Sequence, residues 1–270
     1  GGTVLQVVFA FLGLRTSAGK CFFCAINDVI VALLGFAKEG ARVVVAARSE
    51  TQPHEKLPGT IGETVAEIER LGGEALAVRC DVTSEDSVNA MVAATLDTWG
   101  RIDVLVNNAA IDFPFPCADM PLKRWEIVLR VNLTGPFLCA KAVIPVMREQ
   151  GGGSIVNIAS NAGAERGSGT VGYSAVYGVS KAGLDRLTWA LAAEEGKNNI
   201  AVNAVKPWGV VSTEGMRMWA KPEEQVGWKS PASMVTCVTF LARQDATGVT
   251  GCVAFDDELI CWHGLRVDEG

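Results

Sequence analysis

The chain has 270 residues, of which 49% are hydrophobic and 20% are charged. These proportions are typical of a compact soluble protein, and the length suits one large α/β domain or two small ones. The formal net charge is −6, and positive and negative residues are interspersed along the chain. The composition therefore gives no indication of a nucleic-acid-binding or membrane-binding surface.

The cysteines and histidines limit the chemistry that the chain can carry. Cys80, Cys139 and Cys252 stand in apolar segments, so we expect them to be core residues of a protein in the reducing cytoplasm. Cys21 and Cys24 have the CxxC spacing, but two phenylalanines separate them in a strand-like run, which disfavours a redox or zinc site. No metal site is predicted, and two histidines leave little for a histidine-based hydrolase.

The beginning of the chain is interpreted apart from the rest. Residues 3–14 are apolar but too short to span a bilayer, and they lack the basic start of a secretory signal. They form either a strand or an added segment. We therefore treat residues 1–18 as an uncertain N-terminal segment and expect a single domain over residues 19–270.

From residue 20 onward, apolar strand-like segments alternate with helical segments. Strands are predicted at residues 20–26, 41–47, 75–82, 102–108, 154–160 and 200–207, and residues 252–265 are expected to finish the sheet. Helices are predicted at residues 29–40, 61–71, 84–99, 121–149 and 175–196. Apolar strands alternating with helices indicate a parallel sheet covered on both faces. The predicted fold class is α/β, a single doubly wound, Rossmann-like sheet.

Polar residues collect where these strands end, which is where doubly wound sheets bind ligands. They are Arg48, Ser49, Asp81, Asn107, Asn108 and Ser160. The helix after the fifth of these strands carries Tyr177 and Lys181, whose spacing of four residues places them on one helical face. An ammonium group beside a phenol lowers the pKa of the tyrosine, so that it can exchange a proton near physiological pH.

Each feature also has a plainer interpretation. Most Tyr-x-x-x-Lys pairs are solvated neighbours on a helix. An Asn-Asn turn can satisfy its own backbone, and a serine after a strand is most often a helix cap. The order and spacing of the whole set favour a functional site.

The order of these segments resembles that of the short-chain dehydrogenase/reductase family over roughly residues 37–265. The matching segments are AKEGARVVVAARS, CDV, DVLVNNAA, VNLTGPF, SIVNIAS, YGVSKAG and VNAVKPWGVVST. The segment ETQPHEKLPGTIGETVAEIE is similar to the hydroxysteroid dehydrogenase-like subgroup. The resemblance implies an oxidoreductase that interconverts a carbonyl and a secondary alcohol by hydride transfer with a nicotinamide cofactor. It also implies a homodimer or homotetramer.

The resemblance further implies roles for individual residues. Tyr177 would be the acid/base that protonates the carbonyl oxygen, and Lys181 would lower its pKa and bind the nicotinamide ribose. Ser160 would polarise the carbonyl, and Asn132 would hold a water in a proton relay. The expected cofactor-binding residues are Arg48, Ser49, Asp81, Val82, Asn108, Ala109, Tyr177, Lys181, Pro207, Val210 and Thr213, with Asn107 supporting the central strands.

The chain has two tyrosines, and Tyr173 is the alternative acid/base. It lies thirteen residues after Ser160, a common spacing in the family. The residue four positions after Tyr173 is Tyr177, which cannot supply a positive charge, whereas Tyr177 is followed at that spacing by Lys181. We therefore expect Tyr177 to be the acid/base and Tyr173 to line the substrate pocket or to pack beside it.

The end of the second predicted strand indicates the cofactor. An acidic residue there would accept the ribose hydroxyls of NAD and repel a 2′-phosphate. This chain has Ala47, followed by Arg48 and Ser49, a cation and a hydroxyl that suit the phosphate. NADP is therefore favoured over NAD, and the alternative is that Arg48 is a solvated surface arginine.

The glycine-rich turn that the family places after its first strand is not matched. Counted back from AKEGA, its glycines should fall near Phe23, Asn27 and Val29, and Asp28 would place a negative charge near the phosphates. Three explanations stay open: the loop RTSAGK (residues 15–20) holds the phosphates, the first forty residues are altered relative to a working enzyme, or the cofactor site is lost. The alternative function is accordingly a catalytically inactive scaffold or binding protein of this fold.

Further segments indicate the substrate and partners. Residues 213–228 are rich in Met and Trp and are interpreted as a lid over an apolar carbonyl or alcohol, and Trp208 would narrow or cover the site. A dimer surface is predicted from the apolar residues Trp125, Val128, Leu138, Leu187 and Trp189, unless all of them face the sheet. Neither a nucleic acid nor a membrane is expected as a partner.

Overall fold

The computed structural model describes residues 6–10, 36–37, 40–48, 61–164, 173–212 and 222–267. Its strands form one seven-stranded parallel sheet in the order β3-β2-β1-β4-β5-β6-β7. They are β1 (Gln6–Ala10), β2 (Arg42–Ala47), β3 (Glu74–Arg79), β4 (Val104–Asn107), β5 (Gly153–Ile158), β6 (Ile200–Lys206) and β7 (Val253–Phe255). The doubly wound sheet predicted from the alternating pattern is confirmed.

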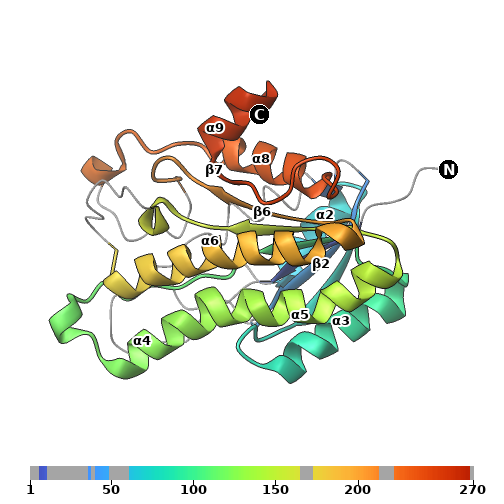
Figure 1. Cartoon of the computed structure of the whole chain (residues 1–270), viewed down its shortest axis with the longest axis horizontal. Helices are drawn as coiled ribbons and strands as arrows, with labels where there is room; N and C mark the ends of the chain where they lie inside the picture. The colour runs from blue at the N-terminus through green and yellow to red at the C-terminus, as the bar shows by residue number, and fades with distance from the viewer. Residues whose placement is uncertain are drawn as a thin grey trace.

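Helices cover both faces of the sheet, with α4, α5 and α6 crossing one face and α8 and α9 on the other (Figure 1). The helices of the first face are α3 (Glu85–Trp99), α4 (Leu122–Leu129), α5 (Gly135–Glu149) and α6 (Ala175–Glu195). Those of the second face are α2 (Ile61–Arg70), α8 (Ala232–Ala242) and α9 (Asp256–His263). Short 3-10 turns lie at η1 (Cys117–Asp119), η3 (Asn161–Gly163), η4 (Gly196–Asn198) and η5 (Pro222–Gln225).

The strands are apolar at consecutive positions because the side chains on both faces of the sheet are buried. Val44 and Ala46 of β2 belong to the core beneath α3, α5 and α6, whereas Val43 and Val45 belong to the core beneath α2 and α8. All seven residues of β6 are buried. A strand with helices on both faces has no solvent-facing side, and an alternating polar pattern would be unfavourable there.

Strand β1 bears out one of the two alternatives for the beginning of the chain, a strand within residues 3–14. Its backbone pairs in parallel with β2 from Gln6 opposite Arg42, and with β4 from Val7 opposite Val104. The domain therefore includes residues that precede the expected boundary at residue 19. The strand predicted at 20–26 lies outside the described residues.

One long helical stretch contains a π-helical turn, η2 (Arg130–Thr134), between α4 and α5. The amide of Gly135 donates to the carbonyl of Arg130, five residues back. The next residue, Pro136, has no amide hydrogen to donate to the carbonyl of Asn132, which removes one α-helical bond at this point. The π turn accommodates this missing hydrogen-bond donor.

The same stretch, Leu122–Glu149, is the one helix of the described residues that is long and apolar enough to cross a membrane. Within its most apolar window, 56% is buried inside the domain. That burial explains its composition, because a helix packed on a sheet needs an apolar stripe along its length.

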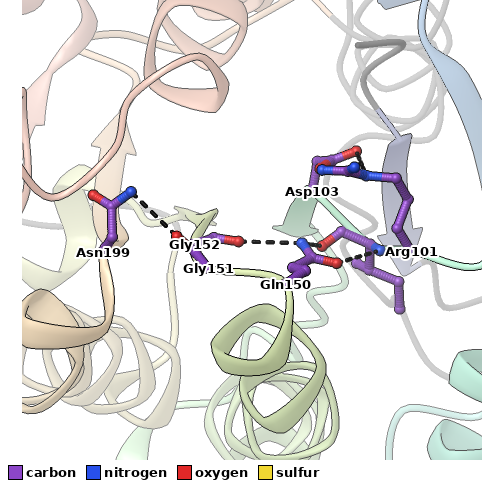
Figure 2. Close-up of polar contacts among 7 residues, drawn as sticks. Arg101, Asp103, Gln150, Gly151, Gly152 and Asn199 are labelled. Atoms are coloured by element: carbon purple, nitrogen blue, oxygen red, sulfur yellow. Dashed lines mark hydrogen bonds and ion pairs between the residues drawn. The ribbon is translucent and has the colours of Figure 1, made fainter.

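Side-chain hydrogen bonds join the amino ends of the central strands (Figure 2). The amide of Gln150 donates to the carbonyls of Ile102 and Gly152 at 2.5 and 3.1 Å, and its oxygen accepts from the amide of Ile102 at 3.2 Å. Asn199, in the left-handed conformation with φ of 58°, donates to the carbonyl of Gly151 at 3.4 Å. These contacts tie β4, β5 and β6 together at the edge opposite the polar strand ends.

Candidate active site

Tyr177 and Lys181 are both buried near the start of α6, with 3% and 2% of their surfaces exposed. The Nζ atom of Lys181 lies 5.7 Å from the centre of the Tyr177 ring and donates to the carbonyl of Ile158 at 2.7 Å. The spacing of four residues therefore brings the two side chains to one face, as predicted. The alternative of two solvated helix neighbours is wrong, because neither side chain is solvated.

Tyr173 packs against Tyr177. Their ring centres are 5.0 Å apart and their planes differ by 13°, which is a stacked arrangement. Tyr173 precedes α6, whereas Tyr177 lies within its first turn. Of the two tyrosines, Tyr177 is the one that stands beside the lysine.

The start of α6 is fixed by Asp112, a residue that the sequence did not single out. The amide of Ser174 donates to Oδ2 of Asp112 at 3.1 Å, and the Ser174 hydroxyl donates to Oδ1. The same hydroxyl accepts from the amide of Tyr177 at 3.3 Å and so caps the helix. Burial raises the pKa of the Asp112 carboxyl, and the hydrogen bonds from Ser174 and Phe113 oppose this rise.

Ser160 lies after the end of β5, in the segment that packs against α6. Its hydroxyl accepts from the amide of Ala162 at 3.2 Å and caps η3, so the helix-cap interpretation of this serine is correct for its local bonding. A Cβ atom added to Gly163 would lie 2.5 Å from the backbone nitrogen of Ala182, and one added to Gly178 would lie 3.0 Å from the carbonyl of Ala162. The two glycines allow the Ser160 segment to pack directly on the helix of Tyr177 and Lys181.

Asn132 is fully buried in the π turn and makes three hydrogen bonds. Its oxygen accepts from the amide of Ile111 at 2.8 Å, and its nitrogen donates to the carbonyl of Ile111 at 2.9 Å. The nitrogen also donates to the hydroxyl of Ser180 at 3.0 Å, which in turn donates to the carbonyl of Tyr177 at 2.7 Å. Asn132 therefore joins the loop after β4 to the helix of Tyr177.

A second polar chain supports the strands beneath the site. Asn107 donates to Asn157 at 2.9 Å, and Asn157 donates to the hydroxyl of Thr188 on α6 at 2.9 Å. Asn107 thus links β4 to β5, in keeping with the supporting role that the family resemblance implied, whereas the roles of Asn157 and Thr188 were missed. Two polar residues in otherwise apolar segments were the available signal, because buried amides need partners.

The ends of β2 and β3 lie beside each other. Burial lowers the pKa of Arg48, and the charge of Asp81 opposes this shift. The Nε atom of Arg48 is buried and has no hydrogen-bond partner among the described residues. The carboxylate of Asp81 accepts from the amide and the hydroxyl of Thr83 at 2.9 and 2.7 Å. Arg48 is therefore a partly buried cation whose Nε donor is unused among the described residues, rather than a fully solvated surface arginine.

The other predicted cofactor residues are distributed over the strand ends. Val82 is buried and would contact a Cβ atom added to Gly135 at 3.1 Å. Asn108 and Ala109 follow β4 and are buried. Pro207 and Val210 follow β6 and are half-buried, whereas Ser49 and Thr213 lie outside the described residues.

Trp208 lies on the surface after β6, with 58% of its area exposed. Its amide donates to the buried carboxylate of Asp256 at 2.8 Å, and its ring meets Phe255 edge to face at 5.0 Å. Most of the proposed lid, including residues 213–221, lies outside the described residues. Within the described residues, no group of three His, Cys, Asp or Glu side chains is placed to hold a metal ion.

Comparisons with known proteins identify the family and the fold. The short chain dehydrogenase family matches residues 32–224. The chain belongs to the short-chain dehydrogenase/reductase family. A solved structure of a putative dehydrogenase from Xanthomonas campestris superposes with a TM-score of 0.79 at 31% identity, covering 97% of this chain and 90% of the other.

Two relatives show how widely the family resemblance extends. A 3-oxoacyl-[acyl-carrier-protein] reductase from Synechocystis sp. is 37% identical over 224 residues, which are 81% of this chain and 86% of that protein. Hydroxysteroid dehydrogenase-like protein 2 from Homo sapiens is 33% identical over 235 residues, or 85% of this chain. The match covers 54% of the human protein, so this family member spans about half of its length.

Residues 1–47 also match the N-terminus of Na+ dependent nucleoside transporters. Two described strands fall in this range, and β1 and β2 pair with each other inside the sheet. The described parts of the segment thus belong to the short-chain dehydrogenase/reductase fold.

Proposed function

We propose that this chain is an NADP(H)-dependent oxidoreductase that interconverts a carbonyl and a secondary alcohol, with Tyr177 as the acid/base. The observation that carries the proposal is the buried contact between Tyr177 and Lys181, in a chain of the short-chain dehydrogenase/reductase family. A phenol held beside an ammonium group away from water ionises more readily than a free phenol. It can then act on a substrate oxygen near neutral pH.

The nicotinamide cofactor, when bound, supplies or accepts the hydride. In the direction of reduction, the Tyr177 hydroxyl gives its proton to the carbonyl oxygen, and Lys181 stabilises the phenolate that remains. Ser160 donates a hydrogen bond to the same oxygen, which requires its hydroxyl to turn from its weak 3.4 Å contact with Asn161. Asn132 holds the backbone of Ile111 and the helix of Tyr177 in place.

Arg48 supports the preference for NADP. The last residue of β2 is Ala47 and the next is Arg48, so a cation and not an acidic residue directly follows the strand. The buried Nε of Arg48 lacks a partner among the described residues, and a phosphate would supply an acceptor for it. This donor is the feature of the described structure that fits the cofactor.

The position of β1 supports one of the three explanations for the unmatched glycine-rich turn. Because β1 ends at Ala10, the residues that follow the central strand are FLGLRTSAGK, with Gly13 and Gly19. The loop RTSAGK, residues 15–20, is therefore our proposed phosphate-binding segment, with Arg15 and Lys20 as its cations. It replaces the alignment that required glycines near Phe23, Asn27 and Val29, all of which lie outside the described residues.

The proposal is tested by two matched variants, Tyr177→Phe and Tyr173→Phe. Each removes one hydroxyl from one of two stacked rings. A screen of apolar ketones and secondary alcohols with NADPH or NADP should reveal turnover, and Tyr177→Phe should lower kcat by about 10²- to 10⁴-fold. Tyr173→Phe should retain most of the activity. Equal activity of Tyr177→Phe and the unmodified protein would contradict the proposed role.

The rival proposal is an inactive scaffold or binding protein, favoured by the unmatched glycine-rich turn. It predicts that the folded protein binds neither NADPH nor NADH and turns over no substrate. Any turnover that Tyr177→Phe abolishes rules it out.

We further propose a homodimer or homotetramer in the cytoplasm. Val128 and Leu138, two of the residues predicted for the dimer surface, face the core instead. Trp189 is exposed, and so are Phe137 and Val179 on the same helices, α5 and α6. Sedimentation velocity separates these assemblies from a monomer.

A further inference from the structure

A buried ion pair lies next to the candidate site and has no part in the mechanism proposed above. Nζ of Lys206, the last residue of β6, lies 2.7 Å from Oδ2 of Asp185 on α6. The two residues are 7% and 4% exposed. Burying two charges carries a large desolvation penalty, and an ion pair in the interior is weak evidence for stability. The pair therefore invites a functional explanation.

Asp185 also acts on Lys181. It follows Lys181 by four residues, so both side chains lie on the face of α6 that packs on the sheet. Burial raises the pKa of Asp185, and the charges of Lys206 and Lys181 both oppose that rise. Its Oδ1 atom is buried and has no hydrogen-bond partner among the described residues. One carboxylate thus balances two ammonium groups while bonding to one of them.

We propose that Asp185 and Lys206 are positioning residues that set the proton affinity of Tyr177 by fixing the charge balance around Lys181. The inference rests on the proposed function, in which Tyr177 is the acid/base. Two cations and one anion leave an excess positive charge when Tyr177 is a phenol. The same set is balanced when Tyr177 is a phenolate, and this difference favours loss of the phenolic proton.

Other charged groups border the site from neighbouring elements. Asp112 follows β4 and is bonded to Ser174, and Asp256 begins α9 and accepts from the amide of Trp208. Arg124 on α4 lies 4.2 Å from the centre of the Phe113 ring. These three charges stay the same in every variant below, so their contributions cancel when the variants are compared.

The chain's two tyrosines allow a direct measurement. In a Tyr173→Phe background, Tyr177 is the single tyrosine, and the ¹³C NMR shift of its Cζ atom reports its ionisation without substrate or cofactor. Asp185→Asn removes the anion with little change of shape, and the pKa of Tyr177 should fall by about one unit. Lys206→Gln removes a cation but can still donate to Asp185, and the pKa should rise by about one unit. The double variant should return towards the background value.

The two single variants must move the titration in opposite directions. A purely structural role predicts unequal stability but no such pair of shifts. Unchanged titrations in folded variants, or two shifts of the same sign, would overturn the inference. Circular dichroism establishes folding, and if Lys206→Gln does not fold, Asp185→Asn decides alone by the presence or absence of the fall.

Activity gives a second readout. In alcohol oxidation the phenolate is the acting base, so the acid limb of the kcat profile should move to lower pH in Asp185→Asn and to higher pH in Lys206→Gln. Failure of the proposed function is seen separately, as turnover that survives Tyr177→Phe. The NMR titration stands independently of that result.

Discussion

Asn132 shows how one buried amide can hold two distant segments in the same place. Its carboxamide bonds both backbone groups of Ile111, and it reaches Ser180 on α6. Because the side chain hydrogen-bonds both the amide and the carbonyl of one residue, it restricts the conformations of the loop after β4. The loop and the helix of Tyr177 consequently keep a fixed separation.

We predict that Asn132→Ala lowers the free energy of unfolding by at least about 2 kcal/mol, because each buried group left unpaired costs about 1–3 kcal/mol. The measurement is urea unfolding at neutral pH. Asn89→Ala, at an exposed position of α3, is the matched control and should change stability by less than about 0.5 kcal/mol. Equal losses in the two variants would show that the bonds of Asn132 contribute little.

Among the secondary-structure elements, the contact between η3 and α6 sets the position of Ser160 relative to Tyr177 and Lys181. Gly163 lets the turn after Ser160 approach α6 to a distance that no side chain permits. We predict that Gly163→Ala destabilises the protein by about 1–3 kcal/mol and lowers kcat, because η3 must move away from Tyr177 and Lys181. Unfolding and turnover measurements on the same preparation check both effects.

Gly196 provides the control for this substitution. Its backbone φ is −54°, and nothing lies within 4 Å of an added Cβ atom. Gly196→Ala should leave activity unchanged and stability equal or slightly higher. Equal stability and equal kcat of Gly163→Ala and Gly196→Ala would show that the close packing at Gly163 does not matter.

The ion pair between Arg148 on α5 and Glu195 on α6 predicts a pH dependence. The hydrogen bond from Arg148 lowers the pKa of Glu195 from its ordinary value of 4.5. The folded form therefore binds this proton less readily than the unfolded chain does. The pair contributes stability above pH 4.5, and this contribution is lost as the pH falls through the lowered pKa.

We accordingly expect Glu195→Gln to lower the free energy of unfolding at neutral pH and to weaken its decline in acid. Denaturant unfolding over a series of acidic and neutral buffers measures both. Glu194→Gln, the exposed neighbour, should leave the pH profile unchanged. A profile of Glu195→Gln that parallels the unmodified protein would refute the expectation.

Local elements could be predicted from the sequence, and long-range placements could not. Helix α6 was expected at 175–196 and spans Ala175–Glu195, because the serine cap and the apolar spacing are local signals. The position of β1 in the sheet depends on its pairing with β2 and β4. A short apolar segment does not by itself indicate which strands it pairs with. The bond between Asp112 and Ser174 joins residues 62 positions apart and was missed for the same reason.

At the scale of the whole molecule, the sheet brings the polar ends of distant strands to one edge. Arg48 and Asp81 lie at the ends of β2 and β3, and Asn108 follows β4. Ser160 follows β5 and packs against α6. Doubly wound sheets bind dinucleotides at this carboxyl edge. At the opposite, amino edge, the Gln150 side chain bonds to the backbone carbonyls of Ile102 and Gly152 (Figure 2).

Cofactor binding is measured by titrating the purified protein with NADPH and with NADH while the cofactor fluorescence is recorded. We predict saturable binding of NADPH, weaker binding of NADH, and a loss of this preference in Arg48→Ala, because the 2′-phosphate loses its cation. If neither cofactor binds at millimolar concentration, the oxidoreductase proposal is contradicted, and the protein is a scaffold that keeps the Tyr177–Lys181 pair without its chemistry.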